Sequence, residues 1–226
     1  MKKYLMFSLS AVAMTALLAF PAAAATPESV DDLVEKLTGD DAEARVMARS
    51  HAGPLGAEAL APVVELMDHD ELDVRNNAQW TLRNIVHYST RPHPGGDNGS
   101  REAVADAVVE LLSEEHSSAV QREALYLISL CGGADHVEAV AAWLDDEDMA
   151  DQACYALVRI PDSAAAEALT DALDNASGEH GARLAHALAQ REEAMAGEKL
   201  EALTDSDDET VAEAAEKALA VRSLRF

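Results

Sequence analysis

The sequence predicts an all-α protein, an α-solenoid of about six stacked helix pairs. Alanine, which favours helices over strands, is abundant, while aromatic residues are only 4% of the 226 residues. After residue 25, apolar residues recur at the spacing of amphipathic helices. One such helix pattern returns six times at a nearly constant interval, which is the signature of stacked repeats.

Residues 1–25 are expected to precede the solenoid as a secretory signal peptide. They contain two lysines, then a short apolar run, then a proline followed by four alanines, which is the order of an export signal with its cleavage site. The alternative is a membrane anchor, but the run is short compared with the ~20 residues that span a bilayer. We therefore expect residues 26–226 to form the solenoid of a periplasmic or secreted protein, without membrane insertion after cleavage.

Each repeat is expected to begin with a short amphipathic helix. The apolar residues of these first helices lie at i, i+3, i+4 and i+7, or at close variants of that spacing, so each helix has one face to bury. The six apolar stripes are Val30, Leu33, Val34 and Leu37; Leu60, Val63, Val64 and Met67; Val104, Val108, Leu111 and Leu112; Val137, Val140, Ala141 and Leu144; Ala166, Leu169, Ala172 and Leu173; and Leu200 with Leu203.

The second helix of each repeat carries the recurring pattern. One residue, here named the core start, is followed four positions later by a small residue and seven and eight positions later by further core residues. Core starts fall at residues 44, 74, 120, 149, 180 and 211, in steps of 30, 46, 29, 31 and 31. The first and fifth copies are the weakest, and the fifth can also be aligned from Gly181. The clearest copies are Val74, Ala78, Thr81 and Leu82; Val120, Ala124, Leu127 and Ile128; Met149, Ala153, Ala156 and Leu157; and Val211, Ala215, Ala218 and Leu219.

An acidic or hydroxylic residue stands in the turn ahead of most second helices. We expect these side chains to cap the helices, because short oxygen side chains accept the free N–H groups at a helix start and carboxylates suit its positive dipole end. A calcium site in residues 145–148 or 205–209 is the alternative, but the glycine and ligand spacing of a calcium loop are missing. The expected caps are Asp40, Asp70, Asp145 and Asp207, four residues before the core start, and Ser117 and Ser177, three residues before it.

The longest step between repeats predicts a loop insertion at 88–100. This segment, YSTRPHPGGDNGS, contains two prolines and three glycines, which interrupt helices. Insertions of this kind often carry function in repeat proteins. His87, His93 and Asp97 offer a metal-binding alternative, since histidine and carboxylate suit zinc. Their spacing matches no known site, so we expect a plain loop and no metal ligands.

The segment DVRNNAQWTLRNI (residues 73–85) resembles the HEAT repeat family, in the short form of the phycobilisome-lyase-like HEAT proteins. It carries the family's Val-Arg-x-x-Ala-x-x-x-Leu core with Arg75 in place, and Arg45 holds the same position in the first repeat. The resemblance implies a right-handed superhelix whose second helices line the concave side. Later repeats depart from the motif, with Gln121, Ala150 and Ala212 in place of the arginine.

Aromatic residues are concentrated at one repeat position that faces away from the core. Six residues after the core start, a helical side chain points ~145° from the core direction, at 100° per residue. The six repeats hold Ser50, Trp80, Tyr126, Tyr155, His186 and Lys217 there. If second helices stack side by side, these rings form a row along the concave face. The row either anchors a partner, as flat rings with polar tips often do, or only fills the gap between helices.

Polar residues flank this row within two helical turns and complete a predicted partner-binding face. Three lie near Trp80, one near Tyr126 and two near Tyr155. The predicted face consists of Asn76, Trp80, Arg83, His87, Arg122, Tyr126, Asp151, Tyr155, Arg159 and His186.

The composition narrows the class of function. The net charge of −25 repels nucleic acid and anionic membranes, and no motif of a catalytic or cofactor-binding site is present. We therefore expect an exported, non-catalytic scaffold or adaptor, monomeric and without a cofactor, that binds a protein or peptide through its concave face. A lyase-like or cofactor-attachment factor, suggested by the bilin lyases of the resembled family, and an acidic metal-binding protein are the alternatives.

The two cysteines, Cys131 and Cys154, are expected to be free and mostly buried. Their positions in neighbouring repeats differ by six residues, or about 9 Å along parallel helices. This offset exceeds the ~7 Å over which α-carbons can be joined by a disulfide.

Overall fold

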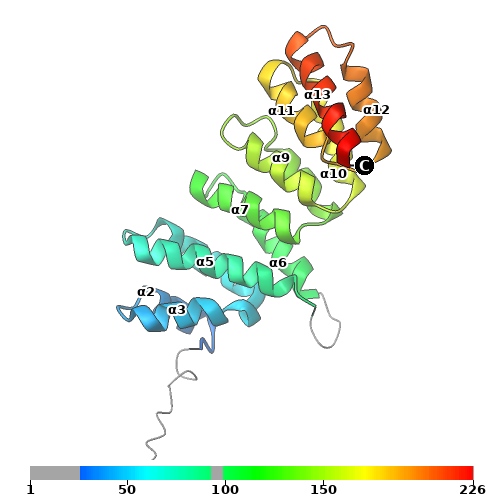
Figure 1. Cartoon of the computed structure of the whole chain (residues 1–226). Coiled ribbons are helices and arrows are strands. Elements are labelled where there is room, and N and C mark those ends of the chain that lie inside the picture. The colour runs from blue at the N-terminus through cyan, green and yellow to red at the C-terminus, as the bar shows by residue number, and fades with distance from the viewer. Residues whose placement is uncertain (1–25, 93–98, 226) are drawn as a thin grey trace, which may run out of the picture.

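A computed structural model describes residues 26–92 and 99–225, and over these residues it consists of α-helices and short 3-10 helices without strands (Figure 1). The predicted all-α solenoid is confirmed. The predicted signal peptide, residues 1–25, lies outside the described residues. Within the described part, no helix is both long enough and apolar enough to cross a membrane.

The described helices pair into six repeats in chain order, as the sequence pattern predicts. The second helices are continuous, whereas the first helices of the second and fourth repeats are broken into short 3-10 and α segments. The second helices are α3 (Ala42–His51), α5 (Leu72–Ser89), α7 (Ser118–Cys131), α9 (Ala150–Arg159), α11 (Gly178–Leu188) and α13 (Glu209–Arg225). The first helices are α2 (Val30–Thr38); η1 (Gly53–Ala59), α4 (Leu60–Val64) and η2 (Glu65–Asp68); α6 (Gly99–Glu110); η3 (Ala134–His136) and α8 (Val137–Ala141); α10 (Ser163–Leu173); and α12 (Ala194–Leu203).

The core lies where the repeat pattern places it. In the second, third and fourth repeats every predicted core residue of the second helix is buried. The first repeat is looser, since His51 is exposed. In the fifth repeat His180 is partly exposed while Gly181 is buried, and a Cβ atom at Gly181 would approach a methyl group of Val211 to 2.7 Å. Close packing of α11 against α13 therefore requires glycine at this position.

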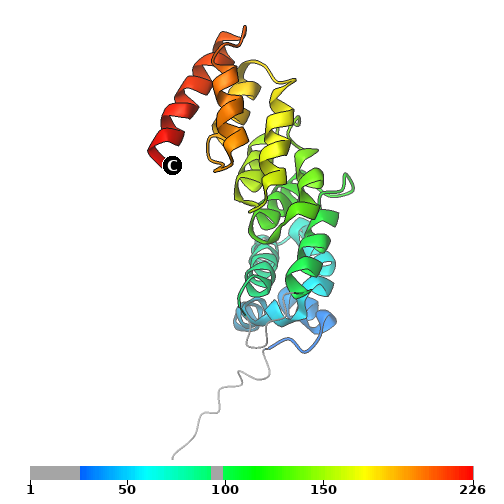
Figure 2. The ribbon, with the colours of Figure 1, turned by 90° about the vertical axis from the view of Figure 1, so that its right-hand side faces the viewer.

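The second helices stack into one continuous wall. Each contacts the next, from α3 to α5 and onward to α13, and Figure 1 looks onto this wall. In Figure 2, turned by 90°, the stack bends toward the side on which α5 and α13 lie. The second helices thus line the inner, concave side of the curve, as the resemblance implies.

The helix caps lie one residue later than predicted. The carboxylate of Asp41 accepts bonds from the N–H groups of Glu43 (2.9 Å) and Ala44 (3.1 Å), and Asp208 acts in the same way at α13. Asp146 accepts two N–H bonds in the turn ahead of α9, whose own cap position makes no side-chain bond. The prediction of Asp40, Asp145 and Asp207 was therefore wrong by one position. In the second helices other than α9 the core start is the third residue, and a cap side chain that reaches its N–H must stand three residues earlier.

The remaining second helices differ in how the turn ahead of them is bound to the helix start. Ser117 caps α7 as predicted, whereas Ser177 makes no side-chain cap bond. Ahead of α5 the cap position is Glu71, also without a side-chain bond, and Arg75 donates to the carbonyl oxygens of His69 (2.6 Å) and Asp70 (2.9 Å). Gln121 donates to the carbonyl of Ser113 (2.9 Å) from the same repeat position. An amide can therefore replace the family's arginine in tying the turn to the helix.

Both ends of the predicted loop insertion, 88–100, are helical. Helix α5 continues through Ser89 and α6 begins at Gly99, while residues 93–98 lie outside the described residues. Of its proposed metal ligands, His93 and Asp97 lie outside the described residues.

The two cysteines are free and buried, as predicted.

Candidate functional site

Three rings from successive repeats lie on the concave wall in one row with two guanidinium groups. The rings of Tyr126 and Tyr155 are stacked, with centroids 6.5 Å apart and planes at 15°. The guanidinium of Arg83 lies 4.8 Å from the centroid of Tyr126 and 5.8 Å from that of Trp80. The guanidinium of Arg159 lies 5.3 Å from the centroid of Tyr155. We call these five residues the ring ladder, and both of its arginines are within reach of cation–π attraction.

The rings of the ladder contact neighbouring side chains and are still partly exposed to solvent. Trp80 is 52% exposed and Tyr155 is 45% exposed, while Tyr126 is partly buried between its neighbours. The core residues of the same helices are almost fully buried, so the helical period alone turns the rings to the opposite side. Large aromatic surface that stays half exposed beside arginine is typical of an anchor for a partner.

A buried carboxylate holds the ladder in place. Glu123, only 5% exposed, accepts bonds from Nε and Nη2 of Arg83 at 2.6 and 2.7 Å, and from the amide of Gln79 at 2.7 Å. This bidentate ion pair raises the pKa of Arg83 above its ordinary value and fixes its plane between two rings. Arg83 is thereby positioned by a residue of the next repeat.

Glu123 and Gln79 were not among the predicted site residues. A charged residue beside the core positions of α7 has no visible partner in the sequence, because the partner is 40 residues away. The available signal was that Gln79 and Arg83 are four residues apart, and so present their donors on one face of α5 toward the neighbouring helix.

Beside the ladder lies a groove with a volume of about 440 Å³. Asp151, on its wall, is paired with Arg183 of the next repeat at 2.6 Å. Arg122 is exposed and makes no hydrogen bond or ion pair with any described residue. The side-chain oxygen of Gln152 is buried and has no donor among the described residues. The groove is lined by Gln79, Arg83, Arg122, Glu123, Tyr126, Asp151, Gln152 and Tyr155.

The structure brings together seven of the ten predicted face residues. Five form the ring ladder, and Arg122 and Asp151 line the groove. The other three, Asn76, His87 and His186, are exposed, but their side chains make no hydrogen bond, ion pair or ring contact with the described residues. The row of rings therefore ends at Tyr155 and does not continue to His186.

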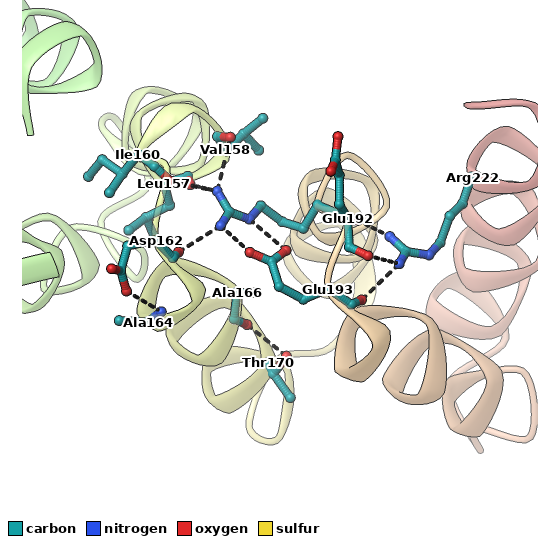
Figure 3. A network of polar contacts seen from close by, with 11 residues as sticks. Leu157, Val158, Ile160, Asp162, Ala164, Ala166, Thr170, Glu192, Glu193 and Arg222 are labelled. Carbon is teal, nitrogen blue, oxygen red and sulfur yellow. Dashed lines mark hydrogen bonds and ion pairs between the residues drawn. The ribbon is translucent and has the colours of Figure 1, made fainter. Parts of the chain in front are cut away.

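A buried arginine secures the end of α9, the helix that carries Tyr155 and Arg159. Arg191, 6% exposed, donates to the carbonyl oxygens of Leu157 (3.1 Å), Val158 (3.2 Å), Ile160 (2.7 Å) and Asp162 (2.7 Å) (Figure 3). These carbonyls include unpaired groups at a helix end, which need donors when buried. The clamp joins the fourth repeat to the fifth.

The clamp is repeated one unit later. Arg222 donates to the carbonyl oxygens of Glu192 (2.9 Å) and Glu193 (2.8 Å), while the Glu193 carboxylate pairs with Arg191 (Figure 3). Both arginines stand eleven residues after their core starts. The two arginines therefore connect the last three repeats into a series, which the motif analysis did not predict.

Neither of the two acidic turns considered for calcium has the arrangement of a cation site. The carboxylates of Asp146 and Asp208 accept backbone N–H groups. Across residues 26–92 and 99–225, no group of three or more His, Cys, Asp or Glu side chains is placed to hold a metal ion.

Comparisons with known proteins address the fold. Residues 55–87, which span most of the second repeat, match the family described as Armadillo/beta-catenin-like repeat. No curated protein matches the chain. An archaeal HEAT-like repeats protein from Thermococcus onnurineus NA1 has a similar structure, with a TM-score of 0.50 and 18% identity over 89% of this chain and 82% of that protein.

Two further structures are similar at lower TM-scores. Human deoxyhypusine hydroxylase, in complex with glycerol, has a TM-score of 0.46 and 21% identity, covering 86% of this chain and 74% of that one. Computationally designed armadillo repeat proteins for modular peptide recognition have a TM-score of 0.39 and 21% identity, covering 85% and 99%. The family match over residues 55–87 and the archaeal structure show that the chain has the HEAT/armadillo repeat fold, which confirms the resemblance to HEAT repeats. The narrower likeness to the phycobilisome-lyase-like form stays a prediction.

Proposed function

We propose that the protein is an exported, non-catalytic scaffold that binds an extended segment of a protein partner along its concave face. The observation that carries this proposal is the ring ladder, whose Arg83, Tyr126 and Tyr155 line a groove of about 440 Å³. Another member of the ladder, Trp80, lies beside Arg83 and is half exposed. Solenoids of this fold present extended concave surfaces that suit elongated ligands. We do not propose the lyase-like or metal-binding alternatives, because no described cluster of side chains favours either.

The geometry supports binding at low entropic cost. Arg83 is held by both oxygens of Glu123, Tyr126 stacks on Tyr155, and the end of α9 is clamped by Arg191. Side chains that are already ordered lose little rotamer freedom when a partner arrives. The ladder is thus organised before binding, and its exposed ring faces can be covered without rearranging the repeats.

The test uses the full chain in a selection against random decapeptides displayed on phage, followed by affinity measurements with the enriched peptides. Trp80→Ala should weaken binding about 30-fold, the effect of losing an aromatic hot spot. Leu72→Ala is the matched control, because Leu72 is 60% exposed on the same helix and belongs neither to the ring ladder nor to the lining of the groove. Thermal unfolding of both variants should stay close to the wild type. Equal binding by the Trp80 and Leu72 variants would contradict the proposal.

Export is proposed from residues 1–25, whose basic, apolar and small-residue order is that of a secretory signal. After expression in a Gram-negative host, the protein should be recovered from the periplasm or medium with the mass of a chain that has lost these residues. Recovery of the uncut chain from the cytoplasm would exclude export and leave the binding proposal untouched.

A further inference from the structure

We infer that the groove selects an extended peptide with a single carboxylate side chain, which binds Arg122, and with a backbone N–H that donates to Gln152. This inference rests on the proposed function and names the chemistry of the segment bound. It follows from asking which polar groups of the groove are already satisfied and which remain available.

The carboxylates of the groove are already neutralised. Glu123 accepts two bonds from Arg83 and one from Gln79. Asp151, whose side chain is 73% exposed, is paired through one oxygen with Arg183 at 2.6 Å. A cationic side chain of a partner would therefore have to compete with an arginine already bound to each carboxylate.

The available charge in and beside the groove is positive. Arg122 is exposed and has no acceptor among the described residues. Arg159, at the end of the ladder, lies against the ring of Tyr155, and its N–H groups have no acceptor among the described residues. A guanidinium pairs best with a carboxylate, because two parallel bonds fit its planar fork. The complementary group on a partner is therefore an Asp or Glu side chain.

The uncharged polar group that is still available in the groove is a hydrogen-bond acceptor. The Gln152 side-chain oxygen is buried in the groove wall and has no donor in the part of the chain that the structure describes, a state that costs free energy until a donor arrives. Gln152 lies on α9 and Arg122 on α7, the two helices whose rings Tyr126 and Tyr155 are stacked. A chain crossing from one helix to the other meets both groups, and its peptide N–H is the donor that every extended segment carries.

The overall charge limits how acidic the partner can be. The chain carries 42 acids against 17 bases, and such a field repels a polyanionic ligand at long range. A segment with one carboxylate among neutral or basic residues avoids this repulsion and still binds Arg122. This expectation is opposite to that of the net charge alone, which favours a purely cationic peptide.

The experiment starts from the decapeptides that the full chain enriches on phage. Enriched sequences should share an Asp or Glu at one position, and changing it to Asn or Gln should weaken binding to the wild type about tenfold or more. Arg122→Gln should lower the affinity for the acidic peptide by a similar factor and leave the amide peptide unaffected. Arg225→Gln, which removes an exposed arginine of α13 and changes the net charge equally, is the matched control.

The contact with Gln152 is tested by methylating the peptide's backbone nitrogens one at a time. One position should weaken binding to the wild type but not to Gln152→Leu, a variant that should fold at least as stably because it removes a buried acceptor without a donor.

The two proposals fail in different ways. Peptides that bind in a Trp80-dependent manner but lack a shared carboxylate, or show no coupling to Arg122, would overturn this inference and leave the proposed function standing. Absence of any Trp80-dependent peptide would overturn both.

Discussion

Replacing Arg191 by methionine should lower the free energy of unfolding by about 3–5 kcal/mol, the usual result of deleting one partner of a buried ion pair. Methionine keeps most of the apolar stem and removes the guanidinium. The change removes the side-chain donor of four carbonyl oxygens and the partner of the Glu193 carboxylate. The carbonyls of Ile160 and Asp162 keep a backbone N–H donor.

The expected loss in the free energy of unfolding depends on how the hydrogen bonds are shared among the nitrogens of Arg191. A hydrogen bond to a charged group is worth about 1.5–3 kcal/mol, but three of the four carbonyls share the single Nη1 of Arg191. Their contributions therefore do not add, and the expected loss stays near that of one buried ion pair. A loss of this size is a large fraction of the ~5–15 kcal/mol that stabilises a typical domain.

The assay is urea unfolding followed by circular dichroism and by tryptophan fluorescence. The two tryptophans, Trp80 and Trp143, lie in the second and fourth repeats, whereas dichroism reports all helices. Because a solenoid is held by contacts between neighbouring repeats, losing the clamp should release the fifth and sixth repeats first. The dichroism midpoint of Arg191→Met should then fall below its fluorescence midpoint.

Arg191→Lys is the control for charge. Lysine keeps the charge opposite Glu193 but lacks the planar fork that reaches several carbonyls, so its stability should lie between the wild type and the methionine variant. A methionine variant that loses less than about 1 kcal/mol, with coincident transitions, would refute the clamp as a stabilising link.

Three other changes test the packing and the charges. Gly181→Ala should destabilise the chain by about 1–3 kcal/mol, because its Cβ would meet a valine methyl of α13 at 2.7 Å; Gly197→Ala, whose nearest contact would be at 3.4 Å, should be neutral or stabilising in the same thermal melts. Burial raises the pKa of Cys131 to about 12 and that of Cys154 to about 11, so neither thiol should react with Ellman's reagent at about pH 8 until urea unfolds the chain, when both should react; full labelling of the folded protein would contradict their burial. The pKa of Asp208 is lowered from 3.8, chiefly by a bond from the N–H of the first residue of α11, so its contribution to stability is complete above the unfolded pKa and is lost as the pH falls through the lowered folded value. The difference in melting temperature between wild type and Asp208→Asn should therefore shrink below about pH 3.8. A difference that stays constant from neutral to strongly acid pH would contradict a stabilising role of the ionised Asp208 carboxylate.

The local features of the fold could be read from the residues because each belongs to a single helix. The spacing of Val74, Ala78 and Leu82 indicates a buried face, and the same 100° period places Trp80 opposite to it. The caps were missed by one residue because the pattern of core residues does not show which of them is the third in its helix. Asp41 and Asp208 could have been chosen correctly had that offset been known.

The contacts of the groove could not be predicted in this way. Arg83 and Glu123 belong to neighbouring repeats, and nothing in either local pattern says that they meet at 2.6 Å. The same holds for Arg191, which resembles an ordinary exposed arginine in the sequence and is 6% exposed in the fold.

The repeat period, the helix pairs and the outward position of the rings thus follow from the order of residues, since they depend on geometry within one helix. The packed solenoid decides the stacking of Tyr126 on Tyr155 and the pairing of the groove carboxylates. It also decides that Arg122 has no acceptor among the described residues. These features depend on the rotation and offset between successive repeats, which are set by all the side chains of the interface together.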